Sequence, residues 1–184
     1  LTPDARFRHP LCAPPAGWPE DWQEGQVWAS RAEIEEGRLL AGREILWLDD
    51  ALEAFLVQVQ GSCRVRLADG TVVRLGYAGK NGHPYSSIGK ILLARGDLDA
   101  GDVSVDAIRG WAARHPGQVP GLLRQNASFV FFRLLDLPAD RGPIGAMGRS
   151  ITPLRSVAVD PAFVPLGTPV WIEKSGRDPF NRLM

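Results

Sequence analysis

The segment YAGKNGHPYSSIGK, residues 77–90, gathers short polar side chains and two tyrosines between glycines. Hydroxyl, amide and amine groups form hydrogen bonds with sugar hydroxyls and amides, and tyrosine rings provide surfaces for a ligand to lie on. Glycines let backbone N–H groups come close to a ligand. Two further polar segments, VQVQGS at 57–62 and QNAS at 125–128, precede runs that favour strands. These residue types predict a site for a sugar-like ligand.

The predicted contacts come from all three polar segments. They are Gln60, Ser62, Tyr77, Lys80, Asn81, Tyr85, Ser86 and Asn126. Among them, the ammonium group of Lys80 is free to meet a carboxylate. The alternative is structural, because the same side chains satisfy loop backbone in many proteins, and Lys80 and Asn81 could instead lock the turn between a hairpin and a helix. Both interpretations stay open at this point.

Other chemistries find little support in the sequence. No P-loop, dinucleotide fingerprint, zinc spacing or nucleophile-elbow serine is present. His9, His83 and His115 are scattered, so we predict no metal site. Cys63 has no evident base partner and is interpreted as a packed thiol. Together with Cys12 it forms either one disulfide or two free buried thiols, and the sequence leaves this open.

Composition restricts the class of protein. The 184 residues are 45% hydrophobic and carry 21 basic and 21 acidic side chains, which argues against a disordered chain or a nucleic-acid binder. No apolar run approaches the roughly 20 residues of a membrane-spanning helix, and the first residues lack the pattern of a signal peptide. We expect a soluble segment of one domain, or of one small domain plus part of another, with both ends read as cuts.

Several short helices are expected. Ser30 with Glu33 forms a capping-box pattern before a helix that ends at Gly37. Leu52, Phe55, Leu56 and Val59 are spaced as one face of a second helix, capped by Asp49 or Asp50. Further helices are predicted at 87–95, at 105–115 with Ser104 as the cap and Val105, Ile108, Trp111 and Ala112 on one face, and around 119–125.

Strands are expected between these helices. Residues 63–77 predict a hairpin with the three-residue loop 68–70, which pairs Val65 with Val73 and Cys63 with Leu75. The run at 128–135 predicts a strand buried on both sides, and RSVAVD and TPVWIE predict two more. The proline-rich first 28 residues predict an extended lead-in that lays tryptophans on the core. The fold class is therefore mainly β with short helices.

Three stretches together resemble a known family: residues 57–92, then QNASFVFFR, then GRSITPLRSVAVDPAFVPLGTPVWIE. They are similar to the membrane-bound lytic murein transglycosylase A family, from about Ser30 to the last residue. The resemblance implies a fold of two β-barrel domains with a groove between them. Residues 1–135 resemble the family-specific inserted barrel with its helices, and 136–184 resemble part of a double-psi β-barrel, the catalytic domain, incomplete at both chain ends.

The resemblance also implies an activity, with no cofactor. Such enzymes cleave the β-1,4 bond between N-acetylmuramic acid and N-acetylglucosamine in peptidoglycan and leave a 1,6-anhydromuramyl end. One carboxylic acid acts first as acid and then as base. Asp160 matches the first of three family aspartates and is expected to be a supporting acidic residue, with the main acid expected beyond Met184. A turn aspartate before Pro161 is the alternative reading.

The remaining expectations concern partners and location. The resemblance implies glycan strands of peptidoglycan as the partner, with other murein-processing proteins as a weaker possibility, and a periplasmic lipoprotein anchored in the outer membrane through a segment outside this chain. The sequence departs from the family at Cys63, where glycine is usual, and at Ala127, where proline is usual. A carbohydrate-binding module without activity stays open as the second function.

Overall fold

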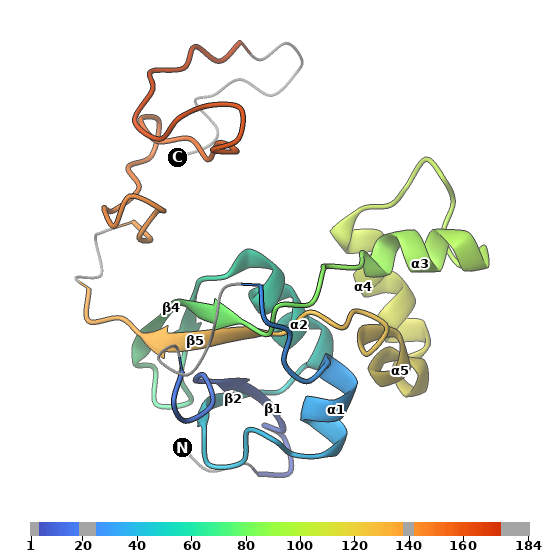
Figure 1. Cartoon of the computed structure of the whole chain (residues 1–184). Coiled ribbons are helices and arrows are strands. Elements are labelled where there is room, and N and C mark those ends of the chain that lie inside the picture. Colours follow the sequence, from blue (N-terminus) through green and yellow to red (C-terminus); the bar gives the residue numbers. More distant parts are fainter. Residues whose placement is uncertain (1–3, 19–24, 138–141, 174–184) are drawn as a thin grey trace. The chain divides into compact units, whose positions relative to one another are not determined.

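The structure is a computed structural model that describes residues 4–18, 25–137 and 142–173. The chain divides into two compact units, Leu1–Leu135 and Asp136–Met184, and each is described by itself. The first unit contains all the named strands and helices of the described residues (Figure 1).

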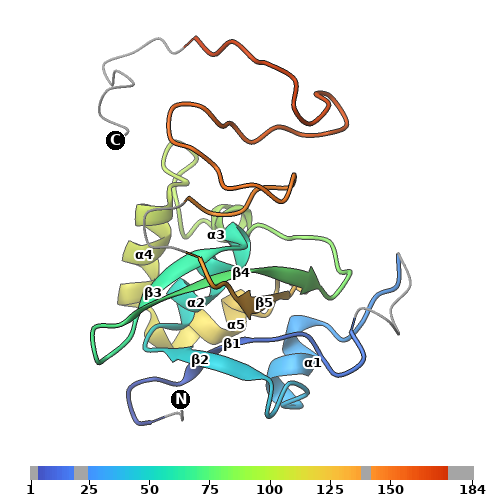
Figure 2. The ribbon, with the colours of Figure 1, turned by 90° about the vertical axis from the view of Figure 1, so that its left-hand side faces the viewer.

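Two antiparallel sheets form the centre of the first unit (Figure 1). One sheet pairs β1 (His9–Cys12) with β2 (Glu44–Leu48). The other has the order β3-β4-β5, built from β3 (Cys63–Arg66), β4 (Val72–Lys80) and β5 (Val130–Leu134). The helix α2 (Ala51–Gln60) packs against strands of both sheets and so joins them into one core (Figure 2).

The predicted hairpin is confirmed in its register. Val65 pairs with Val73 and Cys63 pairs with Leu75, as expected from an apolar face that must stay on one side. Gly70 has φ +86°, the left-handed conformation that this loop requires. Cys63 lies in extended strand backbone, so the position where the family has glycine needs no positive φ here.

The sheet of β1 and β2 was missed by the sequence analysis. Pro10 lies inside β1, and proline within a run argues against a strand because it donates no ladder hydrogen bond. The structure resolves the conflict because β1 has only one neighbour in its sheet, so that the proline needs no second partner. Pro10 pairs with Trp47 of β2.

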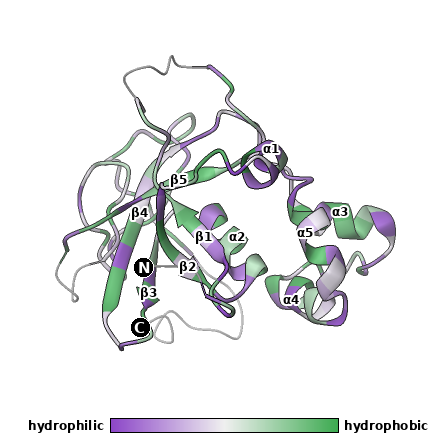
Figure 3. Cartoon of the chain, turned by 90° about the horizontal axis from the view of Figure 1, so that it is seen from below, coloured by the Kyte–Doolittle hydropathy of each residue, from purple (hydrophilic) through white to green (hydrophobic). Residues whose placement is uncertain are grey.

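The helices lie close to their predicted positions, and the predicted caps Ser30, Asp50 and Ser104 are confirmed, whereas Ser87, predicted as the first residue of its helix, is the cap. The helix α1 (Arg31–Glu36) has the Ser30–Glu33 capping box, and α2 (Ala51–Gln60) begins at the Asp50 cap. Ser87 and Ser104 cap α3 (Ile88–Arg95) and α4 (Val105–Arg114), and a 3-10 turn leads into α5 (Val119–Leu123). The last three helices form a group beside the sheets (Figures 1 and 3).

The predicted burial of two residues on the apolar helix faces was wrong. Val59 and Val105 are each 45% exposed, whereas Gln58 is buried. The last turn of α2 faces β5 rather than the helical group, because the Gln58 amide oxygen accepts the Val130 N–H at 3.3 Å. A polar side chain therefore occupies a buried position that the hydrophobic spacing had assigned to its neighbour.

Three clusters of buried side chains make up the core. Leu52 and Phe55 of α2 pack with α3, α4 and α5, and Leu11, Leu46, Leu75 and Phe132 pack between the sheets. A third cluster contains Phe131 of β5, which is fully buried. Figure 3 shows apolar residues along the strands and also in the group of α3, α4 and α5.

The lead-in prediction is confirmed for its described tryptophans. The ring centroids of Trp18 and Trp28 lie 5.3 Å and 5.9 Å from that of Phe131. Trp22 lies outside the described residues. These contacts place the irregular N-terminal chain over one face of β5.

Neither of the two strands predicted for the second unit is present among its described residues. Residues 155–160 and 168–173 have no ladder partner among the described residues, where the only bridge in this unit joins Ile144 and Ser150. A strand needs a neighbour to receive its backbone hydrogen bonds, and apolar side chains in this region remain exposed, Trp171 at 88%. Within the described residues the sheets do not close into a barrel, while a mainly β fold with short helices is confirmed in outline.

Candidate functional site

Four of the predicted contact residues are exposed along β4 and the segment that follows it. Tyr77 and Lys80 lie on β4, and Tyr85 and Ser86 lie between β4 and α3. Tyr77 is 51% exposed and Tyr85 is 54% exposed, although large aromatic residues are usually well buried. Partial burial raises the pKa of the Tyr77 hydroxyl. We call Tyr77, Lys80, Tyr85 and Ser86 the β4 surface.

Asn81 directly follows Lys80 at the end of β4 and is completely buried. Its Nδ2 donates to the carbonyl oxygens of Ala29 and Ala127, both at 2.8 Å, and its Oδ1 accepts the Phe129 N–H at 2.8 Å. Its own carbonyl oxygen accepts the Trp28 N–H at 2.8 Å. The amide therefore ties the end of β4 to the lead-in and to the start of β5. Asn81 thus has a structural role, but its partners lie in these segments and not in the turn between the hairpin and the next helix.

Two glycines on either side of Asn81 allow the lead-in to pass close to the end of β4. Gly79 has φ +137°, and a Cβ there would collide with the ring of Trp18. Gly82 has φ +84°, and a Cβ there would collide with the backbone oxygen of Gln26. Both positions need glycine for conformation and for space, so the lead-in fixes the segment that carries Tyr85.

Asn126 supports the same segment from another side and is also buried. Its Oδ1 accepts the N–H of Ser86 at 3.0 Å and that of Ser128 at 3.3 Å. Gln60 is exposed at the end of α2, and Ser62 is half-buried before β3, the neighbour of β4. Of the eight predicted contacts, six thus reach the solvent on adjoining segments and two hold them; a sugar contact for any of them stays a prediction.

The sequence analysis missed a buried arginine that organises this support. Arg31, only 3% exposed, donates from Nη2 to the Gln58 side-chain oxygen at 2.7 Å and to the Ser128 carbonyl at 2.8 Å. Its Nε donates to the Asn126 carbonyl at 3.1 Å, and its Nη1 forms an ion pair with Glu35 at 3.4 Å. Burial lowers the pKa of Arg31 to about 10, so it stays charged at neutral pH.

Aromatic rings complete the environment of this guanidinium. Its central carbon lies 4.8 Å from the ring centroid of Phe55 and 5.0 Å from that of Phe129. A cation between two ring faces is stabilised by both ring quadrupoles. The only signal in the sequence was a basic residue at the start of a short helix whose other charged residues are glutamates. That signal is too weak to identify a buried arginine.

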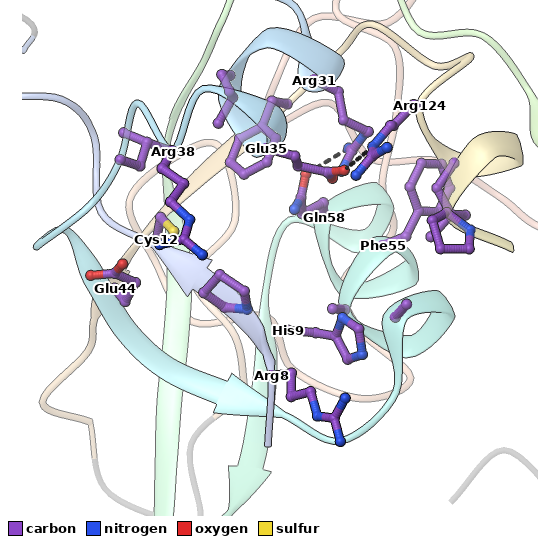
Figure 4. A pocket seen from close by; sticks show the side chains of 18 of the residues that line it. Arg8, His9, Cys12, Arg31, Glu35, Arg38, Glu44, Phe55, Gln58 and Arg124 are labelled. Atoms are coloured by element: carbon purple, nitrogen blue, oxygen red, sulfur yellow. Dashed lines mark hydrogen bonds and ion pairs between the residues drawn. The ribbon is translucent and has the colours of Figure 1, made fainter. Parts of the chain in front are cut away.

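A pocket of about 830 Å³ opens beside Arg31 (Figure 4). Its lining comes from β1, β2, α1, α2 and α5 and from the loop after α1, and it contains none of the β4 surface residues. Arg124 at its edge forms ion pairs with Glu35 and Glu36, both at 3.0 Å. Among the described residues of the first unit, the β4 surface and this pocket are thus separate features that could bind a ligand.

Comparison with known proteins decides the family. Residues 1–133 match the profile of the MltA specific insert domain. The chain is 37% identical over 177 residues to membrane-bound lytic murein transglycosylase A of Escherichia coli strain K12, and 35% identical over 175 residues to that of Vibrio cholerae. The chain belongs to the MltA family.

Solved structures agree with this assignment. The lytic transglycosylase LtgG of Burkholderia pseudomallei is 46% identical, with a TM-score of 0.70, over 91% of this chain and 49% of its own. E. coli MltA with bound chitohexaose is 35% identical, with a TM-score of 0.76, over 89% of this chain and 47% of its own. The chain spans about half the length of the curated MltA relatives, 45% of the E. coli protein and 94% of itself.

The acidic residue expected from the MltA resemblance lies in the second unit. Asp160 is exposed, and its Oδ1 accepts the N–H of Ala162 at 2.9 Å. Its carbonyl oxygen accepts the N–H groups of Phe163 and Val164. This is the turn geometry of the alternative reading, and a supporting role in acid chemistry stays a prediction.

The remaining reactive side chains of this MltA-family chain have structural surroundings. Cys12 and Cys63 are both free, and burial raises the pKa of Cys12 to about 12 and that of Cys63 to about 11. His83 Nε2 lies 2.8 Å from the Trp28 carbonyl oxygen, and the His115 ring stacks on Trp111. Among the described residues no group of His, Cys, Asp or Glu side chains could hold a metal, and none of the helices could span a membrane.

Proposed function

We propose that this chain is the glycan-binding part of a peptidoglycan lytic transglycosylase. The observation that carries the proposal is the β4 surface, where Tyr77, Lys80, Tyr85 and Ser86 are exposed on a backbone held by buried Asn81 and Asn126. Binding groups on a rigid support lose little conformational entropy when a ligand binds. The bound chitohexaose of the E. coli relative supports a glycan as the ligand.

The proposed contacts follow from the chemistry of the exposed groups. The two tyrosine rings would lie against sugar faces, and Ser86, Gln60 and Ser62 would exchange hydrogen bonds with hydroxyl and acetamido groups. Lys80 would meet a carboxylate of the stem peptide, or the lactyl carboxylate of N-acetylmuramic acid where no peptide is attached to it. Buried Asn81 and Asn126 would act through the backbone that they hold, because their side-chain oxygens and the Asn81 amide nitrogen already have partners.

The proposed reaction is cleavage of the β-1,4 bond between N-acetylmuramic acid and N-acetylglucosamine. A single carboxylic acid protonates the glycosidic oxygen, and its carboxylate then takes the proton of the C6 hydroxyl as that oxygen attacks C1. The product is a 1,6-anhydromuramyl end, and the chemistry calls for no cofactor. Asp160 would be a supporting acidic residue, and the length of the relatives that this chain does not span would supply the principal acid.

The proposed cellular location also rests on the relatives. The relatives are named membrane-bound, which supports a periplasmic enzyme attached to the outer membrane, where peptidoglycan is accessible. The glycan strands would be the main partner, with other murein-processing proteins as further ones.

A peptidoglycan-binding module without activity is the second candidate. The exposed turn position of Asp160 favours it, because an acid that must donate a proton at neutral pH needs burial or a neighbouring carboxylate. The test is incubation of the chain with purified peptidoglycan, followed by mass spectrometry for anhydromuramyl ends and by sedimentation of bound chain. Products would support the enzyme, and binding without products would support the silent module. The absence of both products and binding would contradict both candidates.

A further inference from the structure

The pocket next to Arg31 is separate from the β4 surface and has its own set of charges (Figure 4). At about 830 Å³ it falls in the size range of small-molecule sites. Its lining includes four arginines, Arg8, Arg31, Arg38 and Arg124, and two glutamates, Glu35 and Glu44. The charged side chains of this lining therefore carry a net positive charge.

The four arginines are not equivalent. Arg31 and Arg124 both form ion pairs with Glu35. Within the described residues Arg8 and Arg38 have no carboxylate partner, and the Nε of Arg8 donates only to the Ala5 carbonyl at 2.6 Å. In Figure 4 the Arg38 side chain extends from the loop after α1 toward Cys12, and Arg8 lies at the opposite edge. Two guanidinium groups are therefore free to bind an anionic ligand.

The backbone of Arg38 is unusual in a way that bears on its role. Its φ is +50°, at the position after α1 where the Leu39 N–H donates back to the Ile34 carbonyl at 3.1 Å. This left-handed position at the end of a helix normally holds glycine, and another residue there costs about 1 kcal/mol. The chain nevertheless has Gly37 one position earlier, with φ −79°, and arginine at the strained one. Strain of this kind is common where a side chain serves a ligand.

The rest of the lining favours a peptide over a simple anion. Trp47, Leu40 and Ala41 offer apolar contact, and Glu44, which accepts the Gly42 N–H at 2.8 Å, offers a carboxylate to an ammonium group. A ligand that uses all these groups carries a carboxylate, small apolar side chains and an amine. The peptide stem of peptidoglycan has this chemistry, since it contains alanines, free carboxylates and a diamino acid.

We propose that this pocket binds the stem peptide of peptidoglycan, with Arg38 and Arg8 receiving its carboxylates. The proposal rests on the proposed function, because the stem is attached to the same glycan that the β4 surface would bind. Recognition of glycan and peptide by separate parts of one unit would favour peptide-bearing strands over bare ones through effective concentration.

The test is titration of the chain with the free stem tetrapeptide, L-alanyl-γ-D-glutamyl-meso-diaminopimelyl-D-alanine, followed by calorimetry or NMR. We expect saturable binding that is about tenfold or more weaker in Arg38→Gly, since a charge-assisted bidentate bond is lost. Because glycine relieves the positive φ, the melting temperature of Arg38→Gly should equal or exceed that of the parent. Arg8→Ala should weaken binding as well.

Two controls separate this proposal from others. Arg95→Ala removes an exposed arginine of α3 outside the pocket and should leave peptide binding unchanged. Chitohexaose, which has no peptide and no carboxylate, reports on the β4 surface alone and should bind the parent and Arg38→Gly equally. Absence of saturable peptide binding, equal binding by Arg38→Gly, or an equal loss in Arg95→Ala would overturn the inference. If the parent chain did not bind chitohexaose, that result would instead contradict the proposed function.

Discussion

The guanidinium of Arg31 and the side-chain amide oxygen of Gln58 meet at 2.7 Å, although the two residues lie 27 positions apart in the sequence. Both are buried, and the same Gln58 oxygen also accepts the N–H of Val130 at the start of β5. This hydrogen bond connects α1 to α2. The same guanidinium group also donates to the Asn126 and Ser128 carbonyls, in the segment that supports the β4 surface.

Replacement of Arg31 by methionine should strongly destabilise the first unit. The substitution leaves the Gln58 oxygen and two buried carbonyls with fewer partners, for which about 3 kcal/mol of unfolding free energy is expected. Chemical denaturation measures the change. The control is Arg124→Met, whose ion pairs with Glu35 and Glu36 lie at the surface, and it should cost less than about 1 kcal/mol. Equal effects would contradict the assigned role of Arg31.

Asn81→Ala should affect stability and glycan binding together. The change leaves two backbone carbonyls and one N–H without their buried partner, so a loss of about 2–4 kcal/mol is expected. Its exposed neighbour provides the matched comparison, because Lys80→Ala should keep the melting temperature and weaken binding only to ligands that carry a carboxylate. A stable Asn81→Ala chain that no longer bound chitohexaose would show that Asn81 contacts the sugar directly.

Much of the local structure could be predicted because it depends on neighbours in the sequence. The capping box at Ser30 and the register of the 63–75 hairpin are of this kind, and both are confirmed. The β1–β2 sheet was missed because Pro10 and short length argue against a strand until the partner strand is known. Pairing of this sort depends on contacts distant in sequence, which local patterns do not encode.

The candidate site was predictable to a similar extent. Residue types identified the polar segments, but types alone could not separate exposed Tyr77 and Lys80 from buried Asn81. Arg31 and Gln58 escaped notice because charged and amide residues are usually exposed, and only the arrangement of α1, α2 and β5 makes a buried place for them. In the second unit, the strands predicted at RSVAVD and TPVWIE lack neighbours among the described residues.

Gly82→Ala should disturb the segment that carries Tyr85. Gly82 has φ +84°, and a Cβ there would meet the backbone of Gln26 and Val27, so both strain and collision oppose the substitution. Gly42 has nearly the same φ, +81°, with open space around it. Thermal unfolding should show a loss of about 1 kcal/mol for Gly42→Ala and a clearly larger one for Gly82→Ala. Similar losses would contradict the close packing of the lead-in on this segment.

Stability should decrease at alkaline pH because of the two thiols. The pKa values of Cys12 and Cys63 are raised by burial to about 12 and about 11 from an ordinary value of 9.0. Above pH 9 the unfolded chain loses thiol protons that the folded chain keeps, so the unfolding free energy falls as pH rises toward 11. The Cys12→Ala/Cys63→Ala variant should show a flatter decline between pH 9 and 11. An identical slope would argue that the thiols are not buried.

The measurement that tests the central claim most directly is a chitohexaose titration of the chain followed by ¹H–¹⁵N NMR. The account predicts saturable shifts at the amides of Tyr77, Lys80, Tyr85 and Ser86, and several-fold weaker binding in Tyr77→Ala and Tyr85→Ala without loss of melting temperature, because both rings are exposed. Val72→Ala, an exposed change at the other end of β4, should bind as the parent does. Absence of shifts, or shifts confined to other surfaces, would contradict the assignment of the β4 surface as the glycan-binding site.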